Sequence, residues 1–262
     1  MGANSPGVAM KSLNAVRSTA LTCALAVLPV AAWCEGAHHE WDYGRQHGPK
    51  HWGEVKAEFE ACALGKAQSP IDIRNPVPSA LAPIQFDYQP TPLHIIDNGH
   101  TIQVSYAAGS SISVGDQRYE LTQFHFHKPS EERVGGKGYP MVAHLVHKNA
   151  EGALAVVAVL LSQGNQNALV KTLWANLPAE KEKEKVAEKT SINAARLIPS
   201  SHAYYTFAGS LTTPPCSEGV TWFVLVSPMQ VSKAQIDRFG KIYSANARPV
   251  QPLNGRTVKV SQ

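Results

Sequence analysis

Two histidines with one residue between them, His125 and His127, stand in the segment QFHFHKPSEE at residues 123–132. Side chains alternate along a β-strand, so Gln123, His125 and His127 would share one face and the intervening phenylalanines the other. At a rise of about 3.3 Å per residue, the histidine Cα atoms would lie roughly 7 Å apart, close enough for one metal ion. The pair alone is more simply interpreted as two half-exposed strand histidines.

A third histidine makes a metal site the favoured interpretation. His144, in MVAHLVHKN, follows a connection rich in Gly, Pro and charged residues, as hairpin connections are, and is expected on the neighbouring strand. Three neutral imidazoles leave the fourth tetrahedral position of Zn²⁺ open for water, which is typical of catalytic zinc. His147 would face the other way and is interpreted as a packed or surface histidine.

The composition favours a single domain without a nucleic-acid partner. A chain of 262 residues can form one large β-rich domain, and its formal net charge is only +4. No basic stripe is interleaved with aromatic residues, which argues against nucleic-acid binding. The mixed-sign run EKEKEKVAEK, residues 180–189, is most simply interpreted as a solvated helix face.

The N-terminus has the pattern of an export signal. Lys11 and Arg17 precede an apolar run at residues 18–32 that is short for a bilayer span and ends in small residues. We predict a signal peptide over residues 1–36 and a periplasmic or secreted mature protein without a membrane span. A lipoprotein anchor at Cys34 is the less favoured alternative.

Export also explains the four cysteines. Removal of the signal would take away Cys23 and Cys34, leaving Cys62 and Cys216 as a pair in an oxidising compartment. We expect one disulfide between them, the alternative being two free buried thiols. In the chain-entropy model so long a loop contributes at most about 5 kcal/mol.

The remaining pattern predicts a mainly β domain over residues 37–262. Short apolar runs separated by Gly, Pro, Asn and Asp predict strands at residues 93–97, 101–106, 119–127, 141–147, 154–161, 220–226 and 256–261. Helices are expected at residues 54–64, 168–177 and 232–244. No linker or repeat divides the chain, so we expect a single domain with peripheral helices.

Eight blocks in order resemble an exported bacterial α-class carbonic anhydrase. The resemblance implies a central twisted, mostly antiparallel sheet of about ten strands with small peripheral helices. Both cysteines also stand where bacterial and extracellular members pair them. The blocks are WDYGRQHGPKHW (41–52), QSPIDI (68–73), DNGHTIQV (97–104), QFHFHKPSE (123–131), HLVHKN (144–149), LAVVAVLL (154–161), GSLTTPPCSEGVTW (209–222) and RPVQPLNGR (248–256).

The resemblance assigns Zn²⁺ to the three histidines selected by spacing. It implies binding through Nε2 of His125 and His127 and through Nδ1 of His144. Gln123 resembles the hydrogen-bond partner of the first ligand, and the main-chain carbonyl of Asn246 that of the second. Such partners fix the tautomer and orientation of each ring.

One position departs from the family pattern. Many members have a glutamate two residues before the third histidine, where this chain has Val142. A valine cannot accept the imidazole N–H. Either a carbonyl, a water or another side chain replaces the glutamate, or His144 is held less firmly.

The resemblance also implies the catalytic machinery. Thr212 would accept a hydrogen bond from zinc-bound hydroxide and donate its own proton to Glu131, an ionised carboxylate. His100 would carry the released proton from the cavity to buffer. Three further residues would order the relaying water, namely Tyr43, Asn98 and Gln103. An apolar wall for CO₂, with Thr213 at its rim, would comprise Val146, Val156, Leu211, Val220 and Trp222.

These observations predict a zinc lyase that interconverts CO₂ with bicarbonate and a proton by zinc-hydroxide attack. Two alternatives are a non-catalytic carbonic-anhydrase-like binding module and a zinc esterase. Relatives of the first kind usually lose a zinc histidine, and all three are present here. The sequence allows a homodimer without requiring one.

Overall fold

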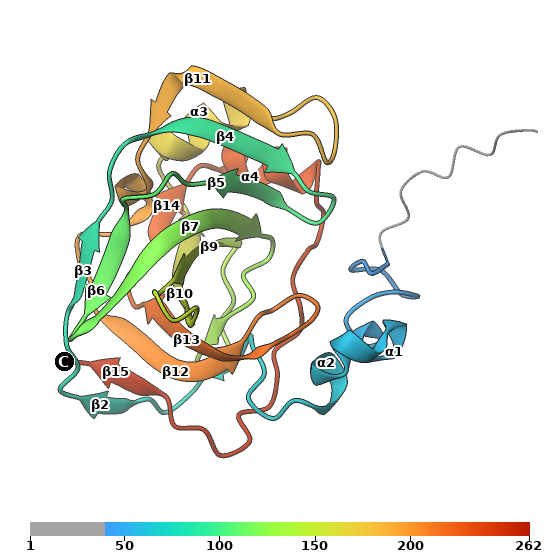
Figure 1. Ribbon diagram of the computed structural model, residues 1–262, viewed down its shortest axis with the longest axis vertical. Helices are drawn as coiled ribbons and strands as arrows, with labels where there is room; N and C mark the ends of the chain where they lie inside the picture. Colours follow the sequence, from blue (N-terminus) through green and yellow to red (C-terminus); the bar gives the residue numbers. More distant parts are fainter. Residues whose placement is uncertain (1–39) are drawn as a thin grey trace, which may run out of the picture. The chain divides into compact units, whose positions relative to one another are not determined.

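The computed structural model describes residues 40–262, so the predicted signal peptide with Cys23 and Cys34 lies outside the described residues. Within residues 40–262, thirteen strands form one twisted sheet (Figure 1). Ten of them follow one another across it in the order β11 (Lys185–Ile192), β4 (Thr91–Asp97), β5 (Ile102–Ser105), β7 (Gln117–His127), β9 (Met141–Lys148), β10 (Leu154–Gln163), β13 (Glu218–Leu225), β12 (Tyr204–Ser210), β15 (Lys259–Ser261) and β2 (Val77–Ser79).

Most neighbouring strands are antiparallel, which confirms the predicted fold class. The parallel pairs of the sheet join β10 to β13 and to β14 (Met229–Val231), and β15 to β2. Antiparallel pairs attach β3 (Ile84–Asp87) to β6 (Ser111–Val114), and β6 to β7. A separate two-stranded parallel ladder joins β1 (Asp72–Ile73) and β8 (Arg133–Val134).

Short helices lie outside the sheet, close to the predicted positions. The segment expected as one helix near residue 54 is divided into α1 (Trp52–Val55), a 3₁₀ turn and α2 (Ala61–Leu64). The 3₁₀ turns are Ala57–Phe59 and Ala194–Leu197, and the other α-helices are α3 (Ala168–Ala175) and α4 (Lys233–Gly240). A capping box between Ser232 and Gln235 satisfies two backbone N–H groups at the start of α4.

The expectation of a helix face at residues 180–189 is wrong. This segment is a turn followed by β11, which pairs with β4 at the edge of the sheet. Glu and Lys are good helix formers, but pairing with β4 outweighs that weak preference. Charges also suit an edge strand, because they oppose pairing with another chain.

Strand alternation separates two apolar clusters on opposite faces of the sheet. On β10, residues 155, 157, 159 and 161 enter the larger cluster with Phe124, Phe126 and Leu145. Residues 156, 158 and 160 enter the smaller cluster with Val142 and Trp222. The face of the smaller cluster is also the face of His144, because Val142 and His144 are two residues apart on β9.

A β-bulge sets the phase of β7 just before the predicted ligands. The register against β9 shifts between Leu121 and Gln123, leaving Thr122 as the extra residue. Leu121 and Phe124 consequently both enter the larger apolar cluster. Beyond the bulge, alternation resumes and directs Gln123, His125 and His127 to the opposite face.

Cys62 and Cys216 form a disulfide, which confirms the predicted pairing. The bridge joins α2 to the loop before β13, and both cysteines pack with Trp52 and Phe59 in a small separate cluster. Disulfides persist mainly in oxidising compartments, so the bridge suggests a protein outside the cytoplasm. Among residues 40–262, no helix has the length and apolar character needed to cross a bilayer.

Reduction of this disulfide should lower thermal stability. Because the bridge closes a long loop, its loss should cost about 2–5 kcal/mol and lower Tm by roughly 5 °C or more. Calorimetry with and without reductant measures the shift. A chain carrying both Cys62→Ala and Cys216→Ala should not respond to reductant. Equal Tm values for oxidised and reduced wild-type protein would contradict the expectation.

Candidate metal centre

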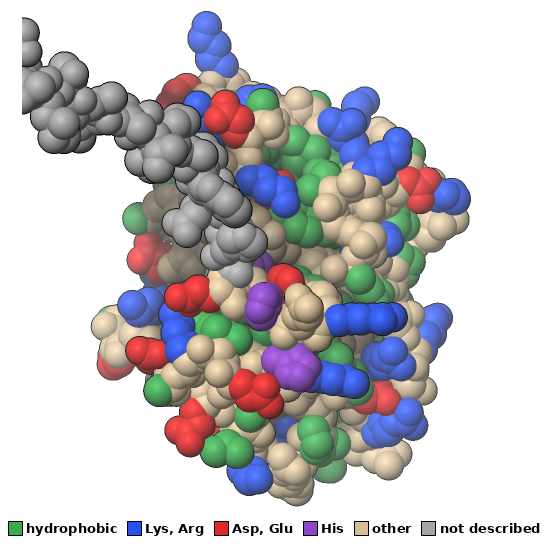
Figure 2. Space-filling view, turned by 90° about the vertical axis from the view of Figure 1, so that its right-hand side faces the viewer, with side chains coloured by type: hydrophobic (Ala, Val, Ile, Leu, Met, Phe, Trp, Pro, Cys, Tyr) green, Lys and Arg blue, Asp and Glu red, His purple; other side chains and the backbone are tan. Residues whose placement is uncertain are grey.

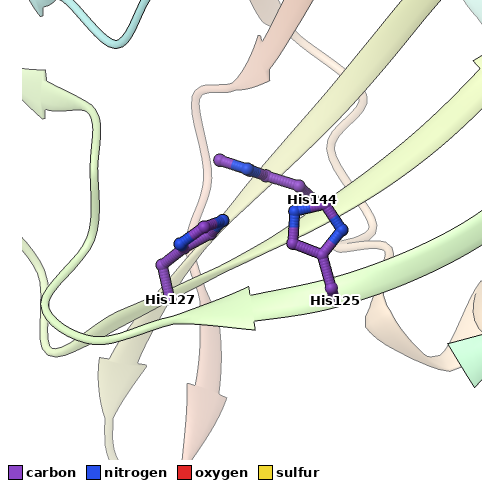
Figure 3. A group of neighbouring side chains, drawn as sticks. All are labelled: His125, His127 and His144. Carbon is purple, nitrogen blue, oxygen red and sulfur yellow. The ribbon is translucent and has the colours of Figure 1, made fainter. Parts of the chain in front are cut away.

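Three histidines converge on the face of the sheet opposite the larger apolar cluster. His125 and His127 lie on β7, His144 lies on β9, and the register places His125 directly opposite His144. One ring nitrogen from each lies within 4.8 Å of the others, so the group could hold a metal ion. Figure 3 shows the rings directed toward one another from the two strands. His147 lies on the other face, where its Nε2 contacts the Tyr88 hydroxyl at 2.8 Å.

The outer nitrogens of the two β7 histidines face protein oxygen atoms. His125 Nδ1 lies 2.8 Å from the Gln123 side-chain oxygen. His127 Nδ1 lies 2.7 Å from the main-chain carbonyl of Asn246, a fully buried residue. An oxygen acceptor places the imidazole proton on Nδ1 and leaves the Nε2 lone pair free.

The outer nitrogen of His144 faces Glu132, a residue that the sequence reasoning missed. His144 Nε2 lies 3.0 Å from Oε1 and 3.2 Å from Oε2 of this buried carboxylate. The Glu131-Glu132 pair was the available signal, because a second acidic residue adjoins one already assigned to the site. Burial opposes protonation of His144, but the adjacent Glu132 carboxylate raises the pKa of His144 above its usual value. Because Nε2 donates to Glu132, Nδ1 is the ring nitrogen that can face a metal.

The nitrogens left free suit a metal that binds imidazole. His127 Nε2 is buried and, among the described residues, has no hydrogen-bond partner. Burial, followed by the nearby His144, lowers the pKa of His125 to about 3, and the same effects keep the pKa of His127 well below its usual value. Both rings are therefore neutral at pH 7. Together with His144 Nδ1, these nitrogens form the donor set of a tetrahedral zinc site with one open position.

Glu131 lies on the inner side of the histidines. Its Oε2 is 3.5 Å from His127 Nε2 and 3.8 Å from His144 Nδ1, while its Oε1 accepts the Arg248 backbone N–H at 2.7 Å. Burial raises the pKa of Glu131 to about 7, although His144 and the Thr212 hydroxyl oppose that rise. The carboxylate is therefore desolvated and lies beside the histidines that could hold a cation.

A cavity of about 200 Å³ with an apolar wall opens on one side of the histidines. Val220 is not among its lining residues, but it packs with the wall residues Val156 and Trp222 in the smaller apolar cluster. The cavity is lined by Gln123, His125, His144, Val146, Val156, Leu211, Thr212, Thr213 and Trp222.

A second, more polar cavity of about 120 Å³ lies on the other side and shares Gln123, His125 and Thr213 with the first. The histidines therefore lie where a cavity with an apolar wall and a more polar cavity meet. The other residues lining the polar cavity are Trp41, Tyr43, Asn98, His100, Thr101, Gln103 and His127.

His100 lies in the β4–β5 turn and stacks on Trp41, which the sequence reasoning did not assign to the site. The two rings are 3.6 Å apart at their centroids and nearly parallel, at 6°. Asn98 accepts the backbone N–H groups of His100 and Thr101 at 3.0 and 2.9 Å, which fixes the turn. The Tyr43 hydroxyl is buried without a hydrogen-bond partner among the described residues.

The surface charges are interspersed on the face shown in Figure 2. Lys and Arg side chains lie there among Asp and Glu, with histidine side chains also exposed. The visible face therefore carries charge of both signs in place of a single basic stripe.

Comparison with known proteins gives one consistent family. The family model described as "Eukaryotic-type carbonic anhydrase" matches residues 47–262. The chain is 44% identical to a carbonic anhydrase of Nostoc sp. over 83% of this chain and 84% of the relative. It is also 44% identical to one of Klebsiella pneumoniae over 90% and 95% of the two chains. The structure of a hyperthermostable carbonic anhydrase from a hydrothermal vent chimney matches with a TM-score of 0.82 and 46% identity, over 85% of this chain and all of that one.

Metal binding should depend on His144 and not on His147. Because the two residues lie on opposite faces of β9, His144→Ala should abolish retention of about one zinc per chain. His147→Ala should retain zinc and lose stability through the cavity that it leaves. Metal analysis after dialysis, with circular dichroism to check folding, measures both. Full zinc content in folded His144→Ala protein would reject the site.

Proposed function

Since the chain belongs to the eukaryotic-type carbonic anhydrase family, we propose that it catalyses the zinc-dependent, reversible hydration of CO₂ to bicarbonate and a proton. One observation carries the proposal: three histidines, of which His127 and His144 are buried and His125 is half-buried, direct ring nitrogens to the junction of a cavity with an apolar wall and a more polar cavity. CO₂ is nonpolar overall, whereas the released proton needs a polar route to solvent. The cavity with the apolar wall suits CO₂, and the more polar cavity suits the proton.

His125, His127 and His144 would hold the zinc through Nε2, Nε2 and Nδ1. Bound Zn²⁺ lowers the pKa of a coordinated water to about 7 and thereby supplies a hydroxide nucleophile at neutral pH. Gln123 and Asn246 fix the rings of His125 and His127 through their oxygen atoms. Fixed rings reduce the reorganisation needed when the metal binds.

Thr212 and Glu131 orient the nucleophile. The Thr212 hydroxyl accepts a hydrogen bond from the nucleophile and donates its own proton to Glu131, which directs a lone pair of the nucleophile toward CO₂. This direction requires an ionised carboxylate, because a protonated one could donate instead. Burial is the largest cause that raises the pKa of Glu131 to about 7, and a nearby cation would favour its ionised form.

CO₂ would bind against the apolar cavity wall. Val146 and Val156 are directly opposite each other on β9 and β10, and Trp222 is opposite Val156 on β13. Neither valine nor Leu211 has a hydrogen-bonding group, and the Trp222 indole N–H already donates to the Ser210 carbonyl at 3.0 Å, so none of these side chains competes for the substrate. Thr213 lies at the rim, since it lines both cavities.

His100 would export the proton through the polar cavity. An imidazole with a pKa near 6.5 exchanges protons readily at neutral pH. Tyr43, Asn98 and Gln103 line the same cavity and would order the intervening water. We further propose that residues 1–36 export the protein to the periplasm or beyond.

Purified protein tests the proposed function against its two rivals. Stopped-flow CO₂ hydration and ester hydrolysis are compared with and without a zinc chelator. We expect fast, chelator-sensitive CO₂ hydration and slow ester hydrolysis. Fast ester hydrolysis alone would indicate a zinc esterase, and no activity in either assay would indicate a binding module.

Proton transfer and CO₂ attack should respond to different substitutions. His100→Ala should lower kcat by at least about tenfold while kcat/KM barely changes, because attack on CO₂ precedes the relay. Thr212→Ala should lower both by about 10- to 100-fold, because it leaves the nucleophile misoriented. Stopped-flow kinetics at several CO₂ concentrations measures the two constants.

Added imidazole buffer should restore much of the His100→Ala loss and little of the Thr212→Ala loss. His94→Ala is the matched control, since His94 lies on β4 and contacts Glu184 away from the cavity. A His100→Ala variant with kcat/KM lowered as much as kcat, and no response to imidazole, would make His100 structural.

A further inference from the structure

A valine stands where His144 would find an acceptor on its own strand. Val142 is two residues before His144 on β9 and shares its face of the sheet. It is fully buried in the smaller apolar cluster, among Val156, Ala158 and Leu160. An apolar side chain at this position leaves the outer N–H of His144 to be satisfied from elsewhere in the fold.

Glu132 reaches the same nitrogen from the loop between β7 and β8. Both of its carboxylate oxygens lie within hydrogen-bond distance of His144 Nε2, at 3.0 and 3.2 Å. Both side chains are withdrawn from water, at 0% exposure for Glu132 and 1% for His144. The adjacent Glu131 approaches the other nitrogen of the same ring, so the imidazole lies between two consecutive carboxylates.

We propose that Glu132 is the positioning residue of His144. Its carboxylate accepts the hydrogen bond from Nε2–H, fixes the ring and thereby directs Nδ1 to the metal. This inference rests on the proposed function, because it assigns a role toward the zinc. The carboxylate comes from a loop instead of the ligand's own strand. The two adjacent glutamates consequently have different roles: Glu131 orients the nucleophile through Thr212, and Glu132 orients the ligand His144.

The loop is held independently of the metal. The Ser130 backbone N–H donates to the Tyr139 carbonyl at 3.0 Å, and the Tyr139 N–H returns a bond to the Ser130 hydroxyl oxygen at 2.8 Å. The Ser130 hydroxyl donates to the Glu132 carbonyl at 2.9 Å, and the Arg133 N–H donates to Ile71. These bonds fix the backbone on both sides of the carboxylate, so Glu132 is preorganised to meet the ring.

The substitution Val142→Glu can show whether His144 needs an acceptor at Nε2 or only a buried negative charge nearby. With Glu132 in place, Val142→Glu adds a second negative charge to an apolar cluster beside the same ring and should be harmful. Without Glu132, the new glutamate offers Nε2 an acceptor from the same strand face and should help. The effect of one substitution is therefore expected to change sign with the residue at position 132.

The experiment measures the rate of zinc release to a chelator from the full chain. Glu132→Ala should release zinc about 10- to 100-fold faster than wild type, and Glu132→Gln less so, because its amide oxygen still accepts. Val142→Glu alone should speed release, whereas Val142→Glu added to Glu132→Ala should recover much of the loss. Glu120→Gln, an exposed carboxylate on β7 that accepts the Gly109 N–H, should match wild type.

The outcomes separate this inference from the proposed function. Wild-type rates in both Glu132 variants, or an equal effect of Val142→Glu in both backgrounds, would overturn the role of Glu132 alone. A wild-type chain that holds no zinc would overturn the proposed function and this role with it. If Glu132→Ala fails to fold by near-ultraviolet circular dichroism, the comparison is made in the Glu132→Gln background.

Discussion

The hydrogen bond from the outer nitrogen of each site histidine to a protein oxygen is the interaction on which the rest of the site depends. A neutral imidazole carries one N–H, so an acceptor at one nitrogen leaves a lone pair at the other. The acceptors differ in kind: a side-chain amide for His125, a main-chain carbonyl for His127 and a carboxylate for His144. These acceptors fix which nitrogen of each ring faces inward before any metal binds. A cation bound there would relieve the cost of burying His127 Nε2, which has no hydrogen-bond partner among the described residues.

The order of strands in the sheet produces the change from polar to apolar surroundings. Across β5, β7, β9 and β10, one row of directly opposed residues runs Gln103, His125, His144 and Ala158. The next row runs Ser105, Gln123, Val146 and Val156. Polar side chains thus lie toward β5 and apolar ones toward β13, with the histidines between them. Strand alternation keeps the larger apolar cluster on the opposite face, where it supports this surface without entering it.

Local spacing predicted those parts of the site that depend on alternation within one strand. Strand alternation alone placed His125 and His127 on one face, and an expected hairpin placed His144 on the neighbouring strand. The candidate ligands could therefore be predicted without knowledge of the fold. The bulge at Thr122 could not, because it appears only in the pairing of β7 with β9. Glu132 escaped prediction for a related reason, since a loop residue meets a strand residue only after tertiary packing. The conformation of β11 could not be predicted for the same reason. Its pairing with β4 outweighs the local helix preference of its Glu and Lys residues.

Asn246 fixes the position of the proposed proton relay relative to the candidate metal ligands. Its carbonyl accepts from His127, while its side-chain amide donates to the carbonyl oxygens of His100 and Phe126, both at 3.0 Å. One fully buried residue therefore holds the turn that bears His100 against the strand that bears His127. The His100 ring is held in turn by its stacking on Trp41 beside the polar cavity. The candidate metal ligands and the proposed relay histidine thus share a support without sharing reacting atoms.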